Sequence, residues 1–293
     1  MSRPLRQGSG KAYAEVIGDP IAQSKSPLIH NFWLGKLGID AEYRATHIRP
    51  EELAEYFAQK RTDAAWLGCN ITMPHKQAVI PLLDEIDPLA LRIAAVNTVV
   101  CGQAGLLAGH NTDAGGFIEP LSDVLGQPSL YRMARIFGAG GAARAIVVAL
   151  ADAGFTLVLA ARDPTKAQAL LDELVPGRED HAASLAHFAS ATDFAFDDRQ
   201  GIIDLIVNAS PLGMAGQPPL ALDFSHVPPG SVFYDIVTHP AETPMLAEAR
   251  RRGFAVIDGY AMLVGQAAKA FAKFFGAPAP RQHDAELRAL LNP

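Results

Sequence analysis

Phe137-Gly138-Ala139-Gly140-Gly141-Ala142-Ala143 closes an apolar run and opens an alanine-rich helical pattern. Gly138 can adopt the backbone angles of a tight turn, and Gly140 has no side chain to keep a pyrophosphate away from the backbone. The N-terminus of the helix that follows would present free N–H groups and a partial positive charge to that phosphate. The stretch therefore predicts the first turn of a dinucleotide-binding fold, although the same string also occurs in strand-to-helix turns that bind nothing.

The second half of the chain alternates apolar runs with helical patterns around this turn. Strands are expected at residues 134–137, 156–161, 202–209, 232–236 and 255–258, and helices at 141–153, 164–174 and 243–252. Such alternation indicates a parallel sheet of the Rossmann type. Residues 177–200 mix charges with short apolar pieces, so they predict only a loosely structured connection.

The first half repeats this scheme. Strands are expected at residues 14–17, 41–46, 66–71 and 94–100, and helices at 27–37, 50–60 and 75–83. A helix at 114–125 would link the halves, a helix at 261–275 would close the chain, and the polar tail 1–11 is expected to be disordered. The predicted fold class is α/β: an N-terminal, mostly parallel α/β domain followed by a Rossmann-like nucleotide-binding domain.

Composition excludes several classes of partner. The 293 residues carry a net charge of -6 and no basic run, which argues against nucleic acid and anionic membranes. The longest apolar runs are too short to cross a bilayer. Cys69 and Cys101 are the only cysteines and lack metal-ligand spacing. With no signal segment at the N-terminus, they indicate a cytoplasmic protein that binds a small molecule and no metal.

Polar strings follow several of the expected strands. Ser24 and Ser26 precede a helix and could both face an anion, although Ser26-Pro27 is also an ordinary helix start. Asn70, Thr72 and Lys76 follow a buried strand, where polar clusters favour a ligand site. Asn97-Thr98 and Asn111-Thr112-Asp113 add amide, hydroxyl and carboxylate groups. His30, Asn31, His75 and His110 are expected to serve local packing or to face solvent.

Seven ordered strings resemble motifs of the shikimate dehydrogenase family. They are Ser24-Lys25-Ser26-Pro27, Asn70-Ile71-Thr72-Met73-Pro74-His75-Lys76, Ala95-Val96-Asn97-Thr98, Asn111-Thr112-Asp113, Gly138-Ala139-Gly140-Gly141-Ala142-Ala143, Asn208-Ala209-Ser210-Pro211-Leu212-Gly213-Met214 and Asp258-Gly259-Tyr260-Ala261-Met262-Leu263-Val264-Gly265-Gln266. The resemblance extends from residue 12 to about residue 275. It implies a substrate-binding domain at 12–113, completed by C-terminal helices at about 259–290, and a nucleotide-binding domain at 114–258.

The resemblance also implies an activity: the reversible, NADP-dependent reduction of 3-dehydroshikimate to shikimate in aromatic amino-acid biosynthesis. Lys76 and Asp113 would form the catalytic pair, with the ammonium group polarising or protonating the carbonyl oxygen. The cyclic hydroxy acid would be bound by Ser24, Ser26, Asn70, Thr72, Asn97 and Gln266. The cofactor would be bound by Gly138, Ala139, Gly140, Gly141, Ala142, Arg162, Lys166, Asn208, Ser210 and Met262.

Two departures from the family pattern leave alternatives open. Arg162 and Lys166 favour the 2′-phosphate of NADP, whereas Asp163 could repel that phosphate and favour NAD, or could simply cap the next helix. Thr238 stands where the family usually has a substrate-binding tyrosine, so quinate or an aminated ring is an alternative ligand. A catalytically silent, ligand-sensing relative is a third alternative, against which the intact Lys76 and Asp113 argue. A homodimer is compatible with the sequence.

Overall fold

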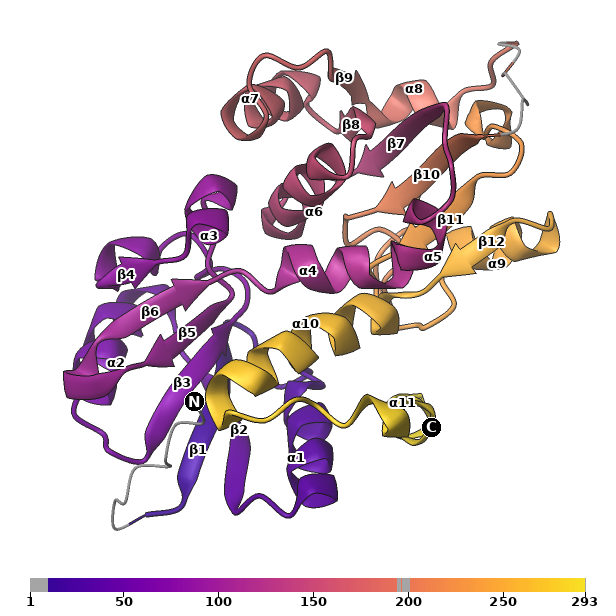
Figure 1. Cartoon of the computed structure of the whole chain (residues 1–293). Helices are drawn as coiled ribbons and strands as arrows, with labels where there is room; N and C mark the ends of the chain where they lie inside the picture. The colour runs from indigo at the N-terminus through magenta and orange to yellow at the C-terminus, as the bar shows by residue number, and fades with distance from the viewer. Residues whose placement is uncertain (1–9, 194–195, 197–200, 293) are drawn as a thin grey trace. The chain divides into compact units, whose positions relative to one another are not determined.

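The computed structural model describes residues 10–193, 196 and 201–292. The chain forms two compact units (Figure 1): unit 1 comprises residues 1–112 and 266–293, and unit 2 comprises residues 113–265. One border falls within helix α10 (Gly259–Phe275). The tail expected to be disordered lies largely outside the described residues, and Lys11 at its end pairs with Asp40 at 3.0 Å.

Unit 1 is built on a six-stranded sheet in the order β2-β1-β3-β5-β6-β4. Its strands are β1 (Ala12–Gly18), β2 (Ala41–His47), β3 (Trp66–Ile71), β4 (Glu85–Ile86), β5 (Thr98–Cys101) and β6 (Leu107–His110). The first three strands pair in parallel, and β5 runs antiparallel to both β3 and β6. Every residue of β3 is buried, as expected for a central strand covered on both faces.

The helices of unit 1 are α1 (Ser26–Leu37), α2 (Leu53–Lys60), α3 (Pro88–Ile93), the end of α10, and α11 (Asp284–Leu291). Short 3-10 turns lie at Pro50–Glu52, Ile80–Leu82, Gln103–Gly105 and Arg281–His283. Two expectations were wrong. The predicted helix 75–83 is a series of turns, because the carbonyl of Lys76 accepts from the N–H of Val96 instead of from Ile80. The predicted strand 94–100 begins only at Thr98, because Ala94 is the left-handed residue that ends α3.

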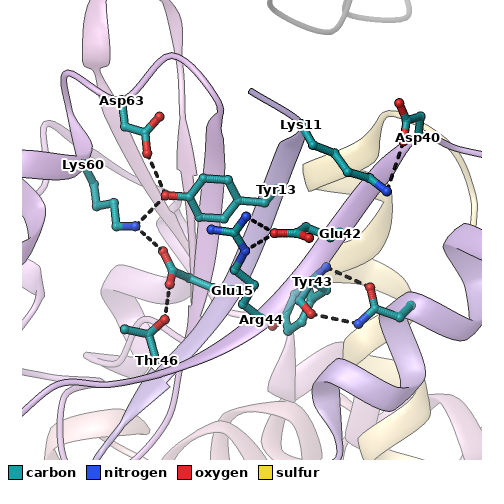
Figure 2. A network of polar contacts seen from close by, with 11 residues as sticks. Lys11, Tyr13, Glu15, Asp40, Glu42, Tyr43, Arg44, Thr46, Lys60 and Asp63 are labelled. Atoms are coloured by element: carbon teal, nitrogen blue, oxygen red, sulfur yellow. Dashed lines mark hydrogen bonds and ion pairs between the residues drawn. The ribbon is translucent and has the colours of Figure 1, made fainter. Parts of the chain in front are cut away.

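A buried carboxylate holds one edge of this sheet together. Glu15 on β1 is 1% exposed and receives Lys60 from α2 at 2.8 Å and the hydroxyl of Tyr56 at 2.9 Å. Thr46 on β2 donates to its other oxygen, and Lys60 also contacts the hydroxyl of Tyr13 at 2.6 Å (Figure 2). Because a buried charge needs such partners, the network joins β1, β2 and α2 into one frame.

Unit 2 is a fully parallel six-stranded sheet in the order β12-β11-β10-β7-β8-β9. Its strands are β7 (Tyr131–Phe137), β8 (Thr156–Ala161), β9 (His181–Ser184), β10 (Ile202–Asn208), β11 (Val232–Asp235) and β12 (Ala255–Ile257). Numbered from β7, this is the 3-2-1-4-5-6 order of a dinucleotide-binding Rossmann sheet, whose direction of winding reverses between β7 and β10. The α/β fold class is thereby confirmed.

The helices of unit 2 are α4 (Asp113–Ile118), α5 (Ser122–Leu125), α6 (Gly141–Asp152), α7 (Pro164–Leu174), α8 (Leu185–Ala189), α9 (Pro244–Arg251) and the start of α10. The expected linking helix 114–125 is α4, a 3-10 turn at Glu119–Leu121, and α5. The unassigned segment 177–200 contains β9 and α8, while residues 194–195 and 197–200 lie outside the described part. A second 3-10 turn lies at Phe224–His226.

Candidate functional site

Three of the strand-end strings in unit 1 meet in one buried hydrogen-bond cluster. Asn70 is 6% exposed and donates to the carbonyl of Asn97 at 3.2 Å and to Thr98 Oγ1 at 2.9 Å. Asn97, 2% exposed, accepts through Oδ1 from the N–H of Thr112 at 2.7 Å and donates to Thr112 Oγ1 at 2.9 Å. The bonds tie together the ends of β3 and β6 and the start of β5. The sequence placed the hydroxyls of Thr98 and Thr112 in these polar strings but did not include either residue among the substrate-binding candidates.

Asn70 is hydrogen-bonded by Tyr43, whose ring is stacked on His30. The hydroxyl of Tyr43 donates to Asn70 Oδ1 at 2.6 Å, and the ring of His30 lies parallel to the Tyr43 ring with centroids 4.0 Å apart. Among the described residues, neither ring nitrogen of His30 has a hydrogen-bond partner, and burial lowers the pKa of His30 to about 3. His30 is therefore a neutral packing residue, as expected, and its stack fixes the orientation of Tyr43.

Lys76 lies half-buried in the turns after β3. Its carbonyl accepts from the N–H of Val96 at 2.8 Å, next to Asn97 in the buried cluster. The neighbouring His75 is 1% exposed and bonds through Nε2 to the carbonyl of Ile48 at 2.6 Å, which confirms its role in local packing. The backbone that carries Lys76 is thus anchored on both sides.

The two serines lie ahead of α1. The N–H of Ser26 donates to Ser24 Oγ at 3.3 Å. Helix α1 begins at Ser26 with Lys25 as its N-cap and without a side-chain capping bond. Ser26-Pro27 is thus a helix start, as the alternative expected, although Lys25 and not Ser26 is the N-cap, and the two hydroxyls stay candidates for an anionic group.

Two of the remaining candidates, Asp113 and Gln266, stand beside the borders between the units in the sequence, and the third, Thr72, follows β3. Asp113 is the first residue of unit 2, begins α4 and is 6% exposed. Gln266 is the first residue of α10 assigned to unit 1, and it is half-buried. Thr72 is half-buried, and its N–H donates to the carbonyl of Ile17 at 3.0 Å.

The glycine turn of unit 2 lies where β7 and β10 are neighbours. Gly138 has a φ of 116°, and a Cβ placed there would approach the carbonyl carbon of Ala209 to 2.9 Å and Ser210 Cβ to 3.0 Å. Only glycine fits this position, because both the backbone angle and the close approach of the second turn exclude a side chain. Gly138 and the 208–210 segment, predicted separately, are therefore adjacent in the fold.

The space beyond the turn suits a dinucleotide. A Cβ at Gly140 or Gly141 would meet no atom within 4 Å among the described residues, so the backbone there is open to a ligand. Gly140 is the N-cap of α6, and Ala142 belongs to that helix's first turn. A 12-residue helix that begins at an open glycine turn, at the point where the sheet reverses its winding, fits a pyrophosphate.

Arg162, Asp163 and Lys166 follow β8, where the adenosine ribose of a dinucleotide is read. The carboxylate of Asp163 accepts from the N–H groups of Thr165 at 3.0 Å and Lys166 at 3.4 Å, so Asp163 is the N-cap of α7. The capping interpretation is confirmed. Arg162 and Lys166 are exposed at this end of the strand, as a phosphate-binding pair would have to be.

The other nucleotide-side candidates differ in burial. Asn208 is fully buried, whereas Ser210 is half-buried beside Gly138. Met262 on α10 is 7% exposed, and Thr238, after β11, is half-buried. Tyr260, near Met262 on α10, is 3% exposed.

The described part of the chain contains neither a metal-binding cluster nor a membrane-spanning helix. No group of three or more His, Cys, Asp or Glu side chains is placed to hold a metal ion. No helix in that part combines the length and the apolar character that crossing a bilayer requires.

The chain is similar to known proteins over nearly its whole length. The family model of the shikimate dehydrogenase substrate binding domain matches residues 16–99. The NADP(+) shikimate dehydrogenase of Sphingopyxis alaskensis is 48% identical over 283 residues, which are 95% of this chain and 96% of the relative.

Solved structures agree. A shikimate 5-dehydrogenase from Thermus thermophilus, in complex with NADP(H) and shikimate, is 34% identical with a TM-score of 0.80, covering 96% of this chain and 99% of that one. Quinate dehydrogenase from Corynebacterium glutamicum, in complex with NAD, is 31% identical with a TM-score of 0.83 at the same coverage. Given this identity over this length, the chain belongs to the shikimate dehydrogenase family.

Proposed function

We propose that this protein catalyses the reversible, NADP-dependent reduction of 3-dehydroshikimate to shikimate. The observation that carries the proposal is that Val96 and Asn97, two consecutive residues, hold the backbone at Lys76 and just before Asp113. Val96 binds the backbone of Lys76, and Asn97 binds the N–H of Thr112, the residue before Asp113. Support on consecutive residues suits an ammonium and a carboxylate that work as a pair.

The chemistry follows from the residue types. Reduced nicotinamide, when bound, supplies the hydride. Lys76 polarises the substrate carbonyl and holds or delivers the proton that the resulting alkoxide needs, and Asp113 orients Lys76. Both tasks require that the ammonium stay close to one oxygen atom, which is consistent with an anchored backbone.

Different residues would bind the carboxylate and the ring hydroxyls of the substrate. We propose that the hydroxyls of Ser24 and Ser26 hold the carboxylate of the substrate. Amide and hydroxyl groups would bind the ring hydroxyls, each of which loses water on binding and needs a partner. These groups belong to Asn70, Thr72, Asn97 and Gln266. In this proposal unit 1 is the substrate domain and unit 2 the nucleotide domain.

NADP is the proposed cofactor. The capping bonds of Asp163 direct its carboxylate to the start of α7, and the exposed Arg162 and Lys166 are the matching charges for a 2′-phosphate. The S. alaskensis relative at 48% identity is an NADP(+) enzyme by name, which supports the same choice.

Quinate dehydrogenation with NAD is the second candidate. It is favoured by the likeness to the C. glutamicum quinate dehydrogenase and by Thr238, whose side chain is smaller than the tyrosine usual in the family. A wider pocket would admit the extra hydroxyl of quinate.

One steady-state assay separates these candidates. The oxidation of shikimate and of quinate is followed with NADP and with NAD by the absorbance of the reduced nicotinamide, with Lys76→Ala as the inactive control. The proposal expects the highest kcat/KM for shikimate with NADP. A higher value for quinate would overturn the substrate, a higher value with NAD would overturn the cofactor, and no turnover in any combination would overturn the activity.

Two further expectations accompany this function. A cytoplasmic location suits both the activity and the two cysteines, which are buried thiols on β3 and β5. A homodimer stays a prediction, which sedimentation of the purified protein over a range of concentrations would test.

A further inference from the structure

Asp235, at the end of β11, is a fully buried carboxylate that receives hydrogen bonds from three residues on two segments of the chain. Asn208 Nδ2 donates to its two oxygens at 3.0 and 3.1 Å. The N–H of Val237 donates to Oδ1 at 3.0 Å, and Thr243 Oγ1 donates to Oδ2 at 2.7 Å. A carboxylate only accepts hydrogen bonds, so it can serve all these donors at once, which an amide cannot.

The first segment is the nucleotide turn, residues 208–213, which follows β10. Asn208 shapes it from inside: its Nδ2 also donates to the carbonyl of Leu212 at 2.8 Å, and its Oδ1 accepts from the N–H and hydroxyl of Ser210 at 3.1 and 2.7 Å. Ser210 Oγ in turn accepts from the N–H of Leu212 at 3.2 Å. The outer side of the nucleotide turn faces Gly138, the first glycine of the turn between β7 and α6.

The second segment is the loop between β11 and α9, which contains both Val237 and Thr243. Val237 precedes Thr238, and its carbonyl lies so close to Gly259 that a Cβ there would collide with it. Thr243 caps α9 and lies 3.5 Å from a Cβ placed on Gly213, at the far end of the nucleotide turn. Asp235 therefore hydrogen-bonds the start of the nucleotide turn through Asn208. Its other partner, Thr243, lies next to Gly213 at the end of that turn.

We infer that Asp235 is a positioning residue that sets the shape of the nucleotide turn through Asn208 and thereby controls dinucleotide binding. The inference rests on the proposed function, because it assigns a role within that site. Burial raises the pKa of Asp235, and the bonds from Val237, Thr243 and Asn208 oppose that rise, so the donors support the charged form that only accepts. An asparagine at this position would turn an NH2 group toward at least one donor.

The test compares Asp235→Asn with the reciprocal double variant Asn208→Asp/Asp235→Asn. The double variant restores a hydrogen bond between positions 208 and 235, with donor and acceptor exchanged, but leaves the carbonyl of Leu212 without the donor that Asn208 supplies. Asp223→Asn is the matched control, since Asp223 also accepts from a backbone N–H, that of Ser225, but lies outside the nucleotide turn. Binding of NADP+ by calorimetry and hydrogen exchange of the unliganded protein are measured on each.

We expect Asp235→Asn to weaken NADP+ binding about tenfold or more, the loss typical of one charge-assisted hydrogen bond, and the double variant to recover part of it. Exchange of the amides of Ser210 and Leu212 should speed up in the single variant only. The inference is overturned if Asp235→Asn binds NADP+ like the control, or if the double variant is folded and binds no better than the single.

The experiment still tests the inference if Asp235→Asn does not fold or if the wild-type protein does not bind NADP+. If Asp235→Asn does not fold, a folded double variant that binds NADP+ supports the inference, whereas a double variant that is unfolded or does not bind overturns it. If the wild-type protein itself fails to bind NADP+, the proposed function fails, and the exchange rates at Ser210 and Leu212 still decide whether Asp235 sets the turn.

Discussion

The N–H of Thr112 donates to Asn97 Oδ1 at 2.7 Å, so a buried side chain from one strand end fixes the backbone immediately before Asp113. Both hydroxyl-bearing neighbours of Asn97, Thr98 and Thr112, also donate to the same oxygen, at 3.1 and 3.2 Å. Asn97 is thus a structural element of the cluster as well as a candidate for substrate binding. The two roles predict different measurements.

Asn97→Ala should lower the free energy of unfolding by about 1–3 kcal/mol, because the buried N–H of Thr112 loses its acceptor. Asn97→Asp keeps an acceptor and should cost less. Urea unfolding monitored by circular dichroism measures both. Thr62→Ala, which removes a bond from an exposed hydroxyl to the carbonyl of Gln59, is the control. Equal stability of Asn97→Ala and the control would contradict the structural role.

Lys76→Ala and Asp113→Asn should each lower kcat about 10²-fold to 10⁴-fold, the range in which a positioned proton donor contributes to catalysis. Binding of NADP+ should be retained, because the candidate nucleotide groups lie at the ends of β7, β8 and β10. Steady-state kinetics with shikimate, together with calorimetry for NADP+, measure the two effects. Near-normal turnover in either variant would remove that residue from the catalytic pair.

His30 should make the protein less stable in mild acid. Burial lowers the pKa of folded His30 to about 3, whereas the unfolded chain takes up this proton at the ordinary value of 6.5. The unfolded state therefore binds more protons below pH 6.5, and stability is lost as the pH falls from 6.5 toward 3, by up to about 1.4 kcal/mol per pH unit.

His30→Phe keeps an aromatic ring against Tyr43 and removes the titrating group, so its stability should fall less between pH 7 and pH 5, by about 2 kcal/mol. Urea midpoints at the two pH values measure this difference. His181→Phe replaces an exposed histidine and should keep the wild-type dependence. If His30→Phe also kept it, His30 would not be the group responsible.

The fold of unit 2 was predictable because its signals are local. Strands such as β10, buried at six of its seven positions, are mostly apolar in the sequence, and the glycine turn between β7 and α6 is contiguous. Strand β9 was missed because none of its four residues is buried, so no apolar pattern marks it. The cap at Asp163 was predictable, since the residues involved lie within three positions of each other.

What could not be predicted depends on partners distant in sequence. The run 75–83 has helical spacing, yet the carbonyl of Lys76 is taken by Val96 and the N–H of Ile80 donates to Gln77, so no regular helix forms. Asp235 showed no signal as a single residue in an apolar strand. Its importance arises only when Asn208 and Thr243 are brought against it.

Gly138 and Gly140, in the turn between β7 and α6, should respond differently to substitution by alanine. Gly138→Ala should destabilise the protein, because a positive φ and the backbone of Ala209 at 2.9 Å both oppose a Cβ. Gly140→Ala should leave stability within about 0.5 kcal/mol, since its Cβ meets no described atom, but should weaken NADP+ binding by occupying the pyrophosphate's approach. Thermal unfolding and calorimetry separate the two, and a Gly140→Ala variant with normal affinity would place the pyrophosphate elsewhere.

Cofactor choice should depend on Arg162 and not on the charge of Asp163. Arg162→Ala should lower kcat/KM for NADP about tenfold or more through the loss of a charge-assisted contact to phosphate, while kcat/KM for NAD changes little. Asp163→Asn retains a good N-cap for α7 and removes only the charge. The ratio of kcat/KM for the two cofactors should therefore stay within about threefold of the wild-type ratio. Asp163→Ala removes the cap as well, so it should also cost about 1 kcal/mol of stability. A large shift toward NADP in Asp163→Asn would show that this carboxylate, despite its capping bonds at 3.0 and 3.4 Å, repels the phosphate.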